Sequence, residues 1–353
     1  MTVFYILLAI LLFGILILVH EFGHFITAKL FGVQVNEFSL FMGPAIWKKQ
    51  KGETLYALRC IPLGGYCAME GEDGDSDSPR AFANAKVWKR FVILVAGAAM
   101  NFIIGVLMTV IFVGFYYGEA DRLPSKQIVH IEDGRPFANV LQVGDEFYSI
   151  NGSRVFISSD ITLLLERDDD GIHDLMVIRN GDKVELKNVE MKRDLETENG
   201  AKFGFSYGFD EFTVGNVLSY SWNQALDFAR LVWMSLGDLI SGRATVSEMG
   251  GPVMIVETVT QAGVASETVG LGILNVVYFF AFIAINLAVM NLLPIPALDG
   301  GRVVCLLLTA SVEKILRRKI NPKYEGYLHA GFLILLLAFM AFITLKDVIG
   351  LFD

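Results

Sequence analysis

Four long stretches without a charged side chain constrain the fold of this 353-residue chain more than any other feature. They cover residues 1–19, 91–118, 268–298 and 326–345. A helix needs about 20 apolar residues to cross a hydrocarbon core of about 30 Å. The sequence therefore predicts a mostly α-helical membrane protein with four transmembrane helices, at about 2–24, 91–117, 270–298 and 327–348.

The composition excludes several other classes of protein. Charged residues make up 19% of the chain, whereas an average soluble domain has about 25%. The net charge of −9 argues against a nucleic-acid-binding protein, which needs clustered lysine and arginine to neutralise phosphates. Three cysteines, Cys60, Cys67 and Cys305, are too few and too scattered for a disulfide framework or a four-thiolate metal site.

The first apolar stretch lacks the basic n-region and the A-x-A site of a cleaved signal peptide, so we expect it to remain as a spanning helix. Basic residues in short loops indicate the cytoplasmic side of a membrane. They gather before the second stretch and between the third and fourth: Lys86, Lys89, Arg90, Arg302, Lys314, Arg317, Arg318, Lys319 and Lys323. Residues 118–212 hold 11 Lys/Arg and 20 Asp/Glu instead. We therefore expect this acidic segment and both chain termini to be extracytoplasmic.

The acidic segment has the pattern of a small folded domain. We expect residues 119–208 to form an inserted, extracytoplasmic α+β domain, with a short helix at 159–167 capped by Ser159 or Asp160. Strands are predicted at 127–131 and 174–178, and hairpin turns at Asn151-Gly152 and Asn180-Gly181.

An extracytoplasmic linker is predicted at residues 209–267. Within it, apolar residues recur at helical spacing from 219 to 240, interrupted by Asp227, Arg230 and Asp238. The spacing predicts an amphipathic helix, for which two interpretations stay open. In the first, the helix lies along the membrane surface; in the second, it is a soluble helix packed on the inserted domain.

The end of the first apolar stretch carries a metal-binding pattern, His20-Glu21-Phe22-Gly23-His24. Residues four apart lie on one helix face, so both imidazoles can reach a single ion. Glu21 can take a proton from metal-bound water, and the ion that this pattern indicates is zinc. Two histidines and a glutamate at membrane depth are costly unless they have such a role.

A catalytic zinc site needs a third protein ligand and an open position for water. The candidate is Asp299, which follows a segment with two helix-breaking prolines at the end of the third stretch. A lone carboxylate at membrane depth is a functional candidate, although a helix-capping role is the alternative. His24 and Asp299 are both predicted to approach the cytoplasmic side, so they can converge.

The chain resembles the bacterial site-2 proteases, in the RseP-like branch of intramembrane zinc metalloproteases. The matching segments are residues 20–24, 38–44, 61–66, 96–101, 251–252 and 291–301. The inserted domain resembles the PDZ domain of that family in residues 134–138, 143–145 and 150–152. Larger relatives carry two such domains, whereas this chain has room for one.

The resemblance implies a mechanism that agrees with the residue patterns. His20, His24 and Asp299 would hold Zn²⁺, and Glu21 would act as general base. The family cleaves transmembrane segments of single-span proteins, such as anti-sigma factors and remnant signal peptides. The resemblance also implies a multi-pass protein of the bacterial inner membrane, embedded in the lipid bilayer, with its active site near the cytoplasmic side.

Substrate-binding residues are also implied by the resemblance. Residues 35–70 resemble a membrane-associated β-hairpin of the family, in which Gly64, Gly65 and Tyr66 would bind an unwound substrate by strand addition. Asn291 matches a position that hydrogen-bonds the unwound substrate. The alternatives are a hairpin without a substrate role, and a local helix-end hydrogen bond for Asn291.

Two rival functions stay open at this point. One is a non-enzymatic membrane adaptor whose PDZ-like domain binds peptide ends, although an intact Glu21 argues against it. The other is a membrane zinc protease that cuts loops outside the bilayer. The PDZ-like domain itself would bind a peptide ligand or exclude substrates that have not been trimmed outside the membrane.

Overall fold

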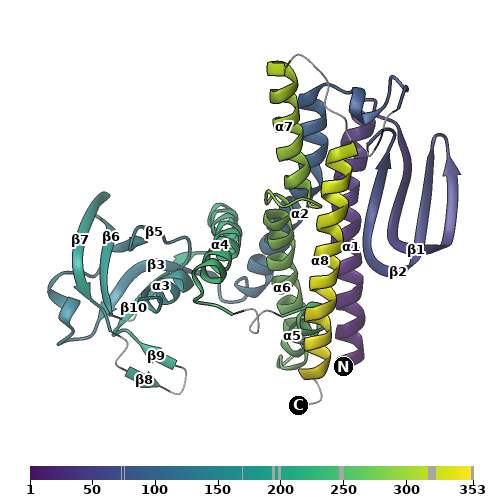
Figure 1. Ribbon diagram of the computed structural model, residues 1–353. Coiled ribbons are helices and arrows are strands. Elements are labelled where there is room, and N and C mark those ends of the chain that lie inside the picture. The colour runs from purple at the N-terminus through teal and green to yellow at the C-terminus, as the bar shows by residue number, and fades with distance from the viewer. Residues whose placement is uncertain are drawn as a thin grey trace. The chain divides into compact units, whose positions relative to one another are not determined.

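The computed structural model describes residues 1–72, 74, 76–168, 170–192, 195–197, 200–245, 250–316 and 323–350 (Figure 1). The chain divides into two compact units. The first comprises Met1–Met108 and Leu231–Asp353, and the second comprises Thr109–Arg230. Residues 317–319, three of the basic residues on which the predicted orientation depends, lie outside the described residues.

Four helices are long and apolar enough to cross a membrane, as predicted. They are α1 (Thr2–Leu30), α2 (Val87–Tyr116), α6 (Val269–Asn291) and α8 (Lys323–Gly350). Helix α1 ends at Leu30, six residues beyond its predicted end. Gly32 follows with a positive φ, a conformation that stops a right-handed helix. Two shorter helices, α5 (Pro252–Val264) and α7 (Asp299–Leu316), belong to the same unit.

Helix α6 ends at Asn291, seven residues before the end that the apolar pattern predicts. Pro294 and Pro296 follow, and each lacks the backbone N–H that a continuing helix needs. The residue before a proline is also driven away from helical backbone angles. Residues 292–298 therefore form an irregular turn, and Asp299 begins a new helix.

The membrane helices pack through an aliphatic and aromatic core that joins α1, α5 and α6. It contains Tyr5, Ala9, Leu16, Val259, Val276, Phe280 and Ala284. Gly263 and Gly272 let these helices approach closely, since a β-carbon on either residue would overlap the Tyr5 ring. Close van der Waals contact at small residues contributes to helix association in lipid.

Strands β1 (Val35–Lys51) and β2 (Thr54–Met69) form the sheet of this unit. Both strands fold back on themselves. Residues 37–40 pair with residues 65–68 on one side and with residues 55–58 on the other. No further described strand pairs with residues 65–68, so this segment is an edge of the sheet.

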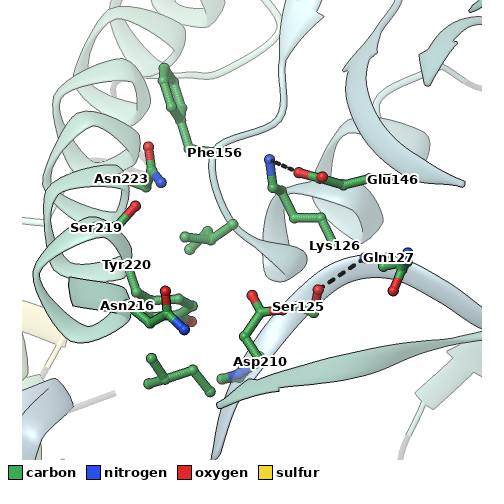
Figure 2. Close-up of a pocket in the computed structure, with 13 residues that line it drawn as sticks. Ser125, Lys126, Gln127, Glu146, Phe156, Asp210, Asn216, Ser219, Tyr220 and Asn223 are labelled. Carbon is green, nitrogen blue, oxygen red and sulfur yellow. Dashed lines mark hydrogen bonds and ion pairs between the residues drawn. The ribbon is translucent and has the colours of Figure 1, made fainter. Parts of the chain in front are cut away.

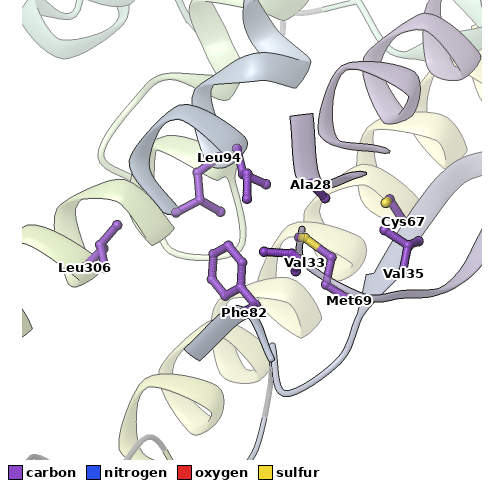
Figure 3. Close-up of a cluster of buried hydrophobic side chains, with 9 residues drawn as sticks. Ala28, Val33, Val35, Cys67, Met69, Phe82, Leu94 and Leu306 are labelled. Atoms are coloured by element: carbon purple, nitrogen blue, oxygen red, sulfur yellow. The ribbon is translucent and has the colours of Figure 1, made fainter. Parts of the chain in front are cut away.

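A second hydrophobic cluster joins this sheet to the ends of α1 and α2 (Figure 3). It contains Ala28, Val33, Val35, Cys67, Met69, Phe82, Ile93, Leu94 and Leu306. Because Leu306 comes from α7, the cluster ties the sheet and the start of α2 to the C-terminal part of the chain.

The second unit contains an antiparallel sheet in the order β10-β3-β4-β6-β7, with β5 paired to β4. Its strands are β3 (Arg122–Ile131), β4 (Glu146–Ile150), β5 (Ser153–Arg154), β6 (Ile172–Arg179), β7 (Asp182–Glu190) and β10 (Phe205–Glu211). A separate pair consists of β8 (Leu195–Thr197) and β9 (Gly200–Lys202). Two single-turn helices, η1 (Phe82–Asn84) and η2 (Pro136–Asn139), lie in the first and second unit respectively.

The hairpin turns predicted in this unit are present in the backbone. Asn151 and Gly152 both have positive φ between β4 and β5, and so do Asn180 and Gly181 between β6 and β7. This is the conformation that tight hairpin turns require. The short helix α3 runs over Ser158–Leu165, and the Asp160 carboxylate accepts hydrogen bonds from the amides of residues 156 and 157. Ser159 and Asp160, the two predicted caps, both lie inside the helix, whose N-cap residue is Ile157.

Helix α4 (Val214–Ser241) contains the predicted amphipathic segment. Its residues up to Arg230 belong to the second unit, where Ala225 and Phe228 are fully buried. The Arg230 guanidinium lies 2.7 Å from the Asp160 carboxylate of α3. For this part of the helix, packing on the inserted domain is therefore the correct one of the two interpretations.

Candidate metal centre

The two histidines of the first helix meet the late aspartate at one point. His20 and His24 are one turn apart on α1, and their Nε2 atoms are 3.3 Å apart. The Oδ2 atom of Asp299, the first residue of α7, lies 3.2 Å from His20 Nε2 and 3.3 Å from His24 Nε2. These are the only described histidine, cysteine or acidic side chains that group closely enough to share an ion.

The spacing of the three atoms fits a zinc ion. Zinc binds nitrogen and oxygen ligands at about 2.0–2.2 Å, so the ligand atoms of a tetrahedral site lie about 3.3 Å apart. Asp299 Oδ2 is buried and accepts no conventional hydrogen bond from the described residues. Two imidazoles and one carboxylate are also the donor set of catalytic zinc sites, with one position left for water.

Neighbouring groups orient both imidazoles. His24 Nδ1 donates to the Ile93 carbonyl at 2.8 Å, which leaves its Nε2 lone pair directed at Asp299. The Asn101 Nδ2 atom lies 3.4 Å from His20 Nδ1, whereas Asn101 Oδ1 is buried without a partner among the described residues. Turning the amide over exchanges these two atoms, so that Oδ1 would accept a hydrogen bond from His20 Nδ1–H and leave His20 Nε2 for the metal.

Helix α2 must come very close to the histidine face of α1. A β-carbon on Gly97 would overlap His24 Nε2 and would lie 2.8 Å from His20 Cε1. A β-carbon on Gly23 would in turn overlap the Ala96 carbonyl. Sequence reasoning used residues 96–101 only for the family resemblance. It had no signal for the contacts that Gly97 and Asn101 make with the histidines.

The turn before Asp299 is also tightly packed. A β-carbon on Gly300 or Gly301 would overlap carbonyl groups of the turn that precedes them. Ala297 has a φ of +80°, a conformation that is strained for a residue with a β-carbon, at about 1–3 kcal/mol. Its N–H donates to His329 Nδ1 on α8 at 2.9 Å. Packing around the turn therefore determines where the Asp299 carboxylate points.

The general-base candidate Glu21 lies beside the sheet edge. A β-carbon on Gly65 would be 3.1 Å from Glu21 Cγ and 3.0 Å from the Ser39 carbonyl, so the edge segment approaches α1 at this point. Gly64 has a φ of +64°, and the Tyr66 ring lies 5.5 Å from the Arg59 guanidinium. Asn291 is the last residue of α6 and is half-buried.

The second unit contains a polar pocket of about 250 Å³ between the sheet and α4 (Figure 2). Its wall includes Lys126 and Glu146, which form an ion pair at 2.8 Å. Helix α4 contributes polar side chains from the other side: Asn216, Ser219, Tyr220 and Asn223. Among the described residues of this unit, no three histidine, cysteine or acidic side chains lie close enough together to share a metal ion.

The chain is similar in sequence to known proteins over most of its length. Peptidase family M50 matches residues 8–339. A putative zinc metalloprotease of Fusobacterium nucleatum is 31% identical over 355 positions, which cover 98% of this chain and 99% of the relative. One of Clostridium acetobutylicum is 35% identical over 353 positions, covering 99% and 98%. The regulator of sigma-W protease RasP of Bacillus subtilis is 26% identical over 425 positions, covering 97% and 98%.

Proposed function

This chain belongs to peptidase family M50, the site-2 proteases, and from that premise we propose that it cleaves transmembrane segments of single-span membrane proteins. It is a zinc metalloprotease with four helices that can span a membrane. The observation that carries the proposal is the convergence of His20, His24 and Asp299 within the apolar helix bundle. A metal site at this place in the fold is suited to a substrate that also lies in the bilayer.

We assign the roles of the site residues as follows. His20, His24 and Asp299 hold the zinc ion, which when bound polarises the scissile carbonyl and lowers the pKa of its water toward about 7. Glu21 takes the proton of the attacking water and later passes it to the leaving amine. The Ile93 carbonyl and the Asn101 amide keep both imidazoles oriented.

A transmembrane substrate must be unwound before it can be cut, because a helical peptide bond is shielded and hydrogen-bonded. Each backbone group freed in apolar surroundings costs several kcal/mol unless it is paired again. We assign this pairing to the edge of β2 at Gly64, Gly65 and Tyr66, with Asn291 as a further hydrogen-bonding group. The approach of Gly65 to Glu21 supports this assignment, because a strand added at this edge would run past the general base.

Replacement of Gly65 tests the edge. Gly65→Val places two methyl groups between the sheet and α1, and we expect kcat/KM for a transmembrane substrate to fall at least tenfold while zinc content stays at one per chain. Loss of zinc in this variant would instead assign Gly65 to the architecture of the metal centre. Unchanged kcat/KM would remove the edge from the substrate path.

The proposal includes a class of natural substrates. The Bacillus relative is named for regulation of sigma-W, and by analogy we assign this protein membrane-bound anti-sigma factors and remnant signal peptides as substrates. The second unit would lie on the extracytoplasmic side, with the metal centre near the cytoplasmic side. As a PDZ-like domain it would bind a peptide end or exclude substrates with large external domains.

Deletion of residues 122–207 tests the exclusion role. We expect the deleted form to cleave substrates that keep their external domain, whereas the full chain cleaves only trimmed ones. Equal discrimination by both forms would contradict the size filter. Binding of short peptides to the full chain, measured by fluorescence anisotropy, would identify the peptide-binding alternative.

The decisive experiment uses purified protein in detergent and a fluorogenic single-span substrate. We expect cleavage that a zinc chelator abolishes and that added zinc restores, at a bond inside the span. Helix-breaking residues placed in the span should accelerate it, because they lower the cost of unwinding. Cleavage only in the flanking loops would favour the loop-cutting protease, and binding without cleavage would favour the adaptor.

A further inference from the structure

His329 makes a hydrogen bond that none of the assigned roles explains. It lies on the membrane-spanning segment of α8, and its Nδ1 atom accepts the Ala297 N–H at 2.9 Å. Its other ring nitrogen is shielded from solvent. His329 is not among the residues that group as metal ligands, so it does not contribute a direct ligand in this arrangement.

The donor of this hydrogen bond, the Ala297 N–H, belongs to the turn that precedes the ligand Asp299. Ala297 is the only non-glycine residue with positive φ between α6 and α7, and it precedes the ligand Asp299 by two residues. Pro294 and Pro296 have no N–H groups with which to stabilise the same turn. The main-chain amides of Ile295 and Leu298 bond within the turn, whereas that of Ala297 bonds to another helix.

We propose that His329 is a positioning residue: it holds the Ala297 backbone so that the Asp299 carboxylate meets His20 and His24. An aliphatic side chain would leave the Ala297 N–H without this acceptor in an apolar environment. The turn would then relax from its strained conformation, and Asp299 Oδ2 would move away from the two Nε2 atoms. The inference rests on the assignment of Asp299 as a zinc ligand in the proposed function.

Two variants of similar size separate the hydrogen bond from packing. In His329→Asn, Oδ1 occupies about the position of Nδ1 and can accept the same N–H. In His329→Leu, a methyl group occupies that position and accepts nothing. Asp347→Asn serves as a control for the attachment of α8, because the Asp347 carboxylate accepts the Gly251 and Met254 amides far from the turn.

The full-length protein is stripped with a chelator and titrated with Co²⁺, whose visible absorption reports ligand geometry, and with Zn²⁺ in competition with a chromophoric chelator. We expect His329→Leu to weaken metal affinity by about 10–100-fold, the range found for groups that orient ligands, and to change the Co²⁺ spectrum. We expect kcat to fall at least tenfold with KM within about twofold. His329→Asn should restore affinity and spectrum to within about threefold of wild type.

Several outcomes would overturn the inference. Wild-type affinity and spectrum in His329→Leu would do so, and so would equal defects in the Leu and Asn variants. An equal loss of affinity in Asp347→Asn would assign the effect to general loosening of α8. Asp299→Ala, measured in parallel, tests the underlying ligand assignment: full zinc affinity in that variant refutes the proposed metal centre, whatever the His329 variants show.

Discussion

Asp299 Oδ2 lies 3.2 Å from His20 Nε2, although the two residues belong to helices at opposite ends of the sequence. This contact joins the first and last parts of the membrane unit at one point. A metal ion held there would crosslink α1 to the first residue of α7. Zinc should therefore contribute to stability as well as to activity.

Removal of the aspartate ligand should release the metal. Asp299→Ala leaves two imidazoles, and we expect zinc affinity to fall at least 100-fold and activity to disappear. Metal analysis after dialysis against a weak chelator measures the loss. Asp182→Ala, an exposed carboxylate in the β6–β7 hairpin, is the control and should keep one zinc per chain. Stoichiometric zinc and a normal rate in Asp299→Ala would refute the ligand assignment.

Removal of the general base should separate metal binding from turnover. Glu21→Gln keeps the shape of the side chain but cannot accept a proton at neutral pH, so we expect normal zinc content and a rate reduced at least 10³-fold. A single-span substrate should still bind, which makes the variant suitable for trapping substrates in native membranes. Undiminished cleavage by Glu21→Gln would assign the proton transfer to another group.

A single methyl group on α2 should disturb the metal centre. In Gly97→Ala the new β-carbon would overlap His24 Nε2, so the two helices must separate or the imidazole must turn away. We expect zinc affinity and kcat each to fall at least tenfold. Gly114→Ala is a matched control in the same helix, since a β-carbon there meets no atom within 4 Å. Equal zinc affinity and kcat in the two variants would show that α1 and α2 leave room for a methyl group at Gly97.

The buried carboxylate Asp227 predicts a pH dependence in the second unit. Burial, with a further contribution from the neighbouring Asp160 carboxylate, raises the pKa of Asp227 from 3.8 to about 7 despite its ion pair with Arg230. Between about pH 4 and pH 7 the folded form thus keeps a proton that the unfolded form releases. Raising the pH across this window therefore lowers the free energy of unfolding.

Asp227→Asn removes this dependence because its side chain stays neutral. We expect the difference in melting temperature, variant minus wild type, to increase steadily from pH 4.5 to pH 7.5 in detergent. Asp182→Asn, at an exposed position, should show a constant difference over the same range. A flat difference for Asp227→Asn would mean that Asp227 is already ionised at low pH.

Local sequence determined the spanning helices, the shared face of the two histidines and the hairpin turns. Apolar stretches of sufficient length determine spanning helices, because a backbone in lipid must satisfy its hydrogen bonds within itself. The i, i+4 spacing determines that His20 and His24 share one helix face. Asn-Gly pairs determine the hairpin turns, since asparagine and glycine tolerate positive φ. Each of these features depends only on neighbours in the chain.

Tertiary structure alone decided how the metal centre is assembled. The distance from Asp299 to the two histidines depends on how α1 and α7 pack, and the orientation of the imidazoles depends on Ile93 and Asn101 of α2. The bond from Ala297 to His329 depends on where α8 lies. No short sequence pattern encodes these contacts, because each one joins residues that lie far apart along the chain. Such residues meet only when the helices pack closely at small residues such as Gly23 and Gly97.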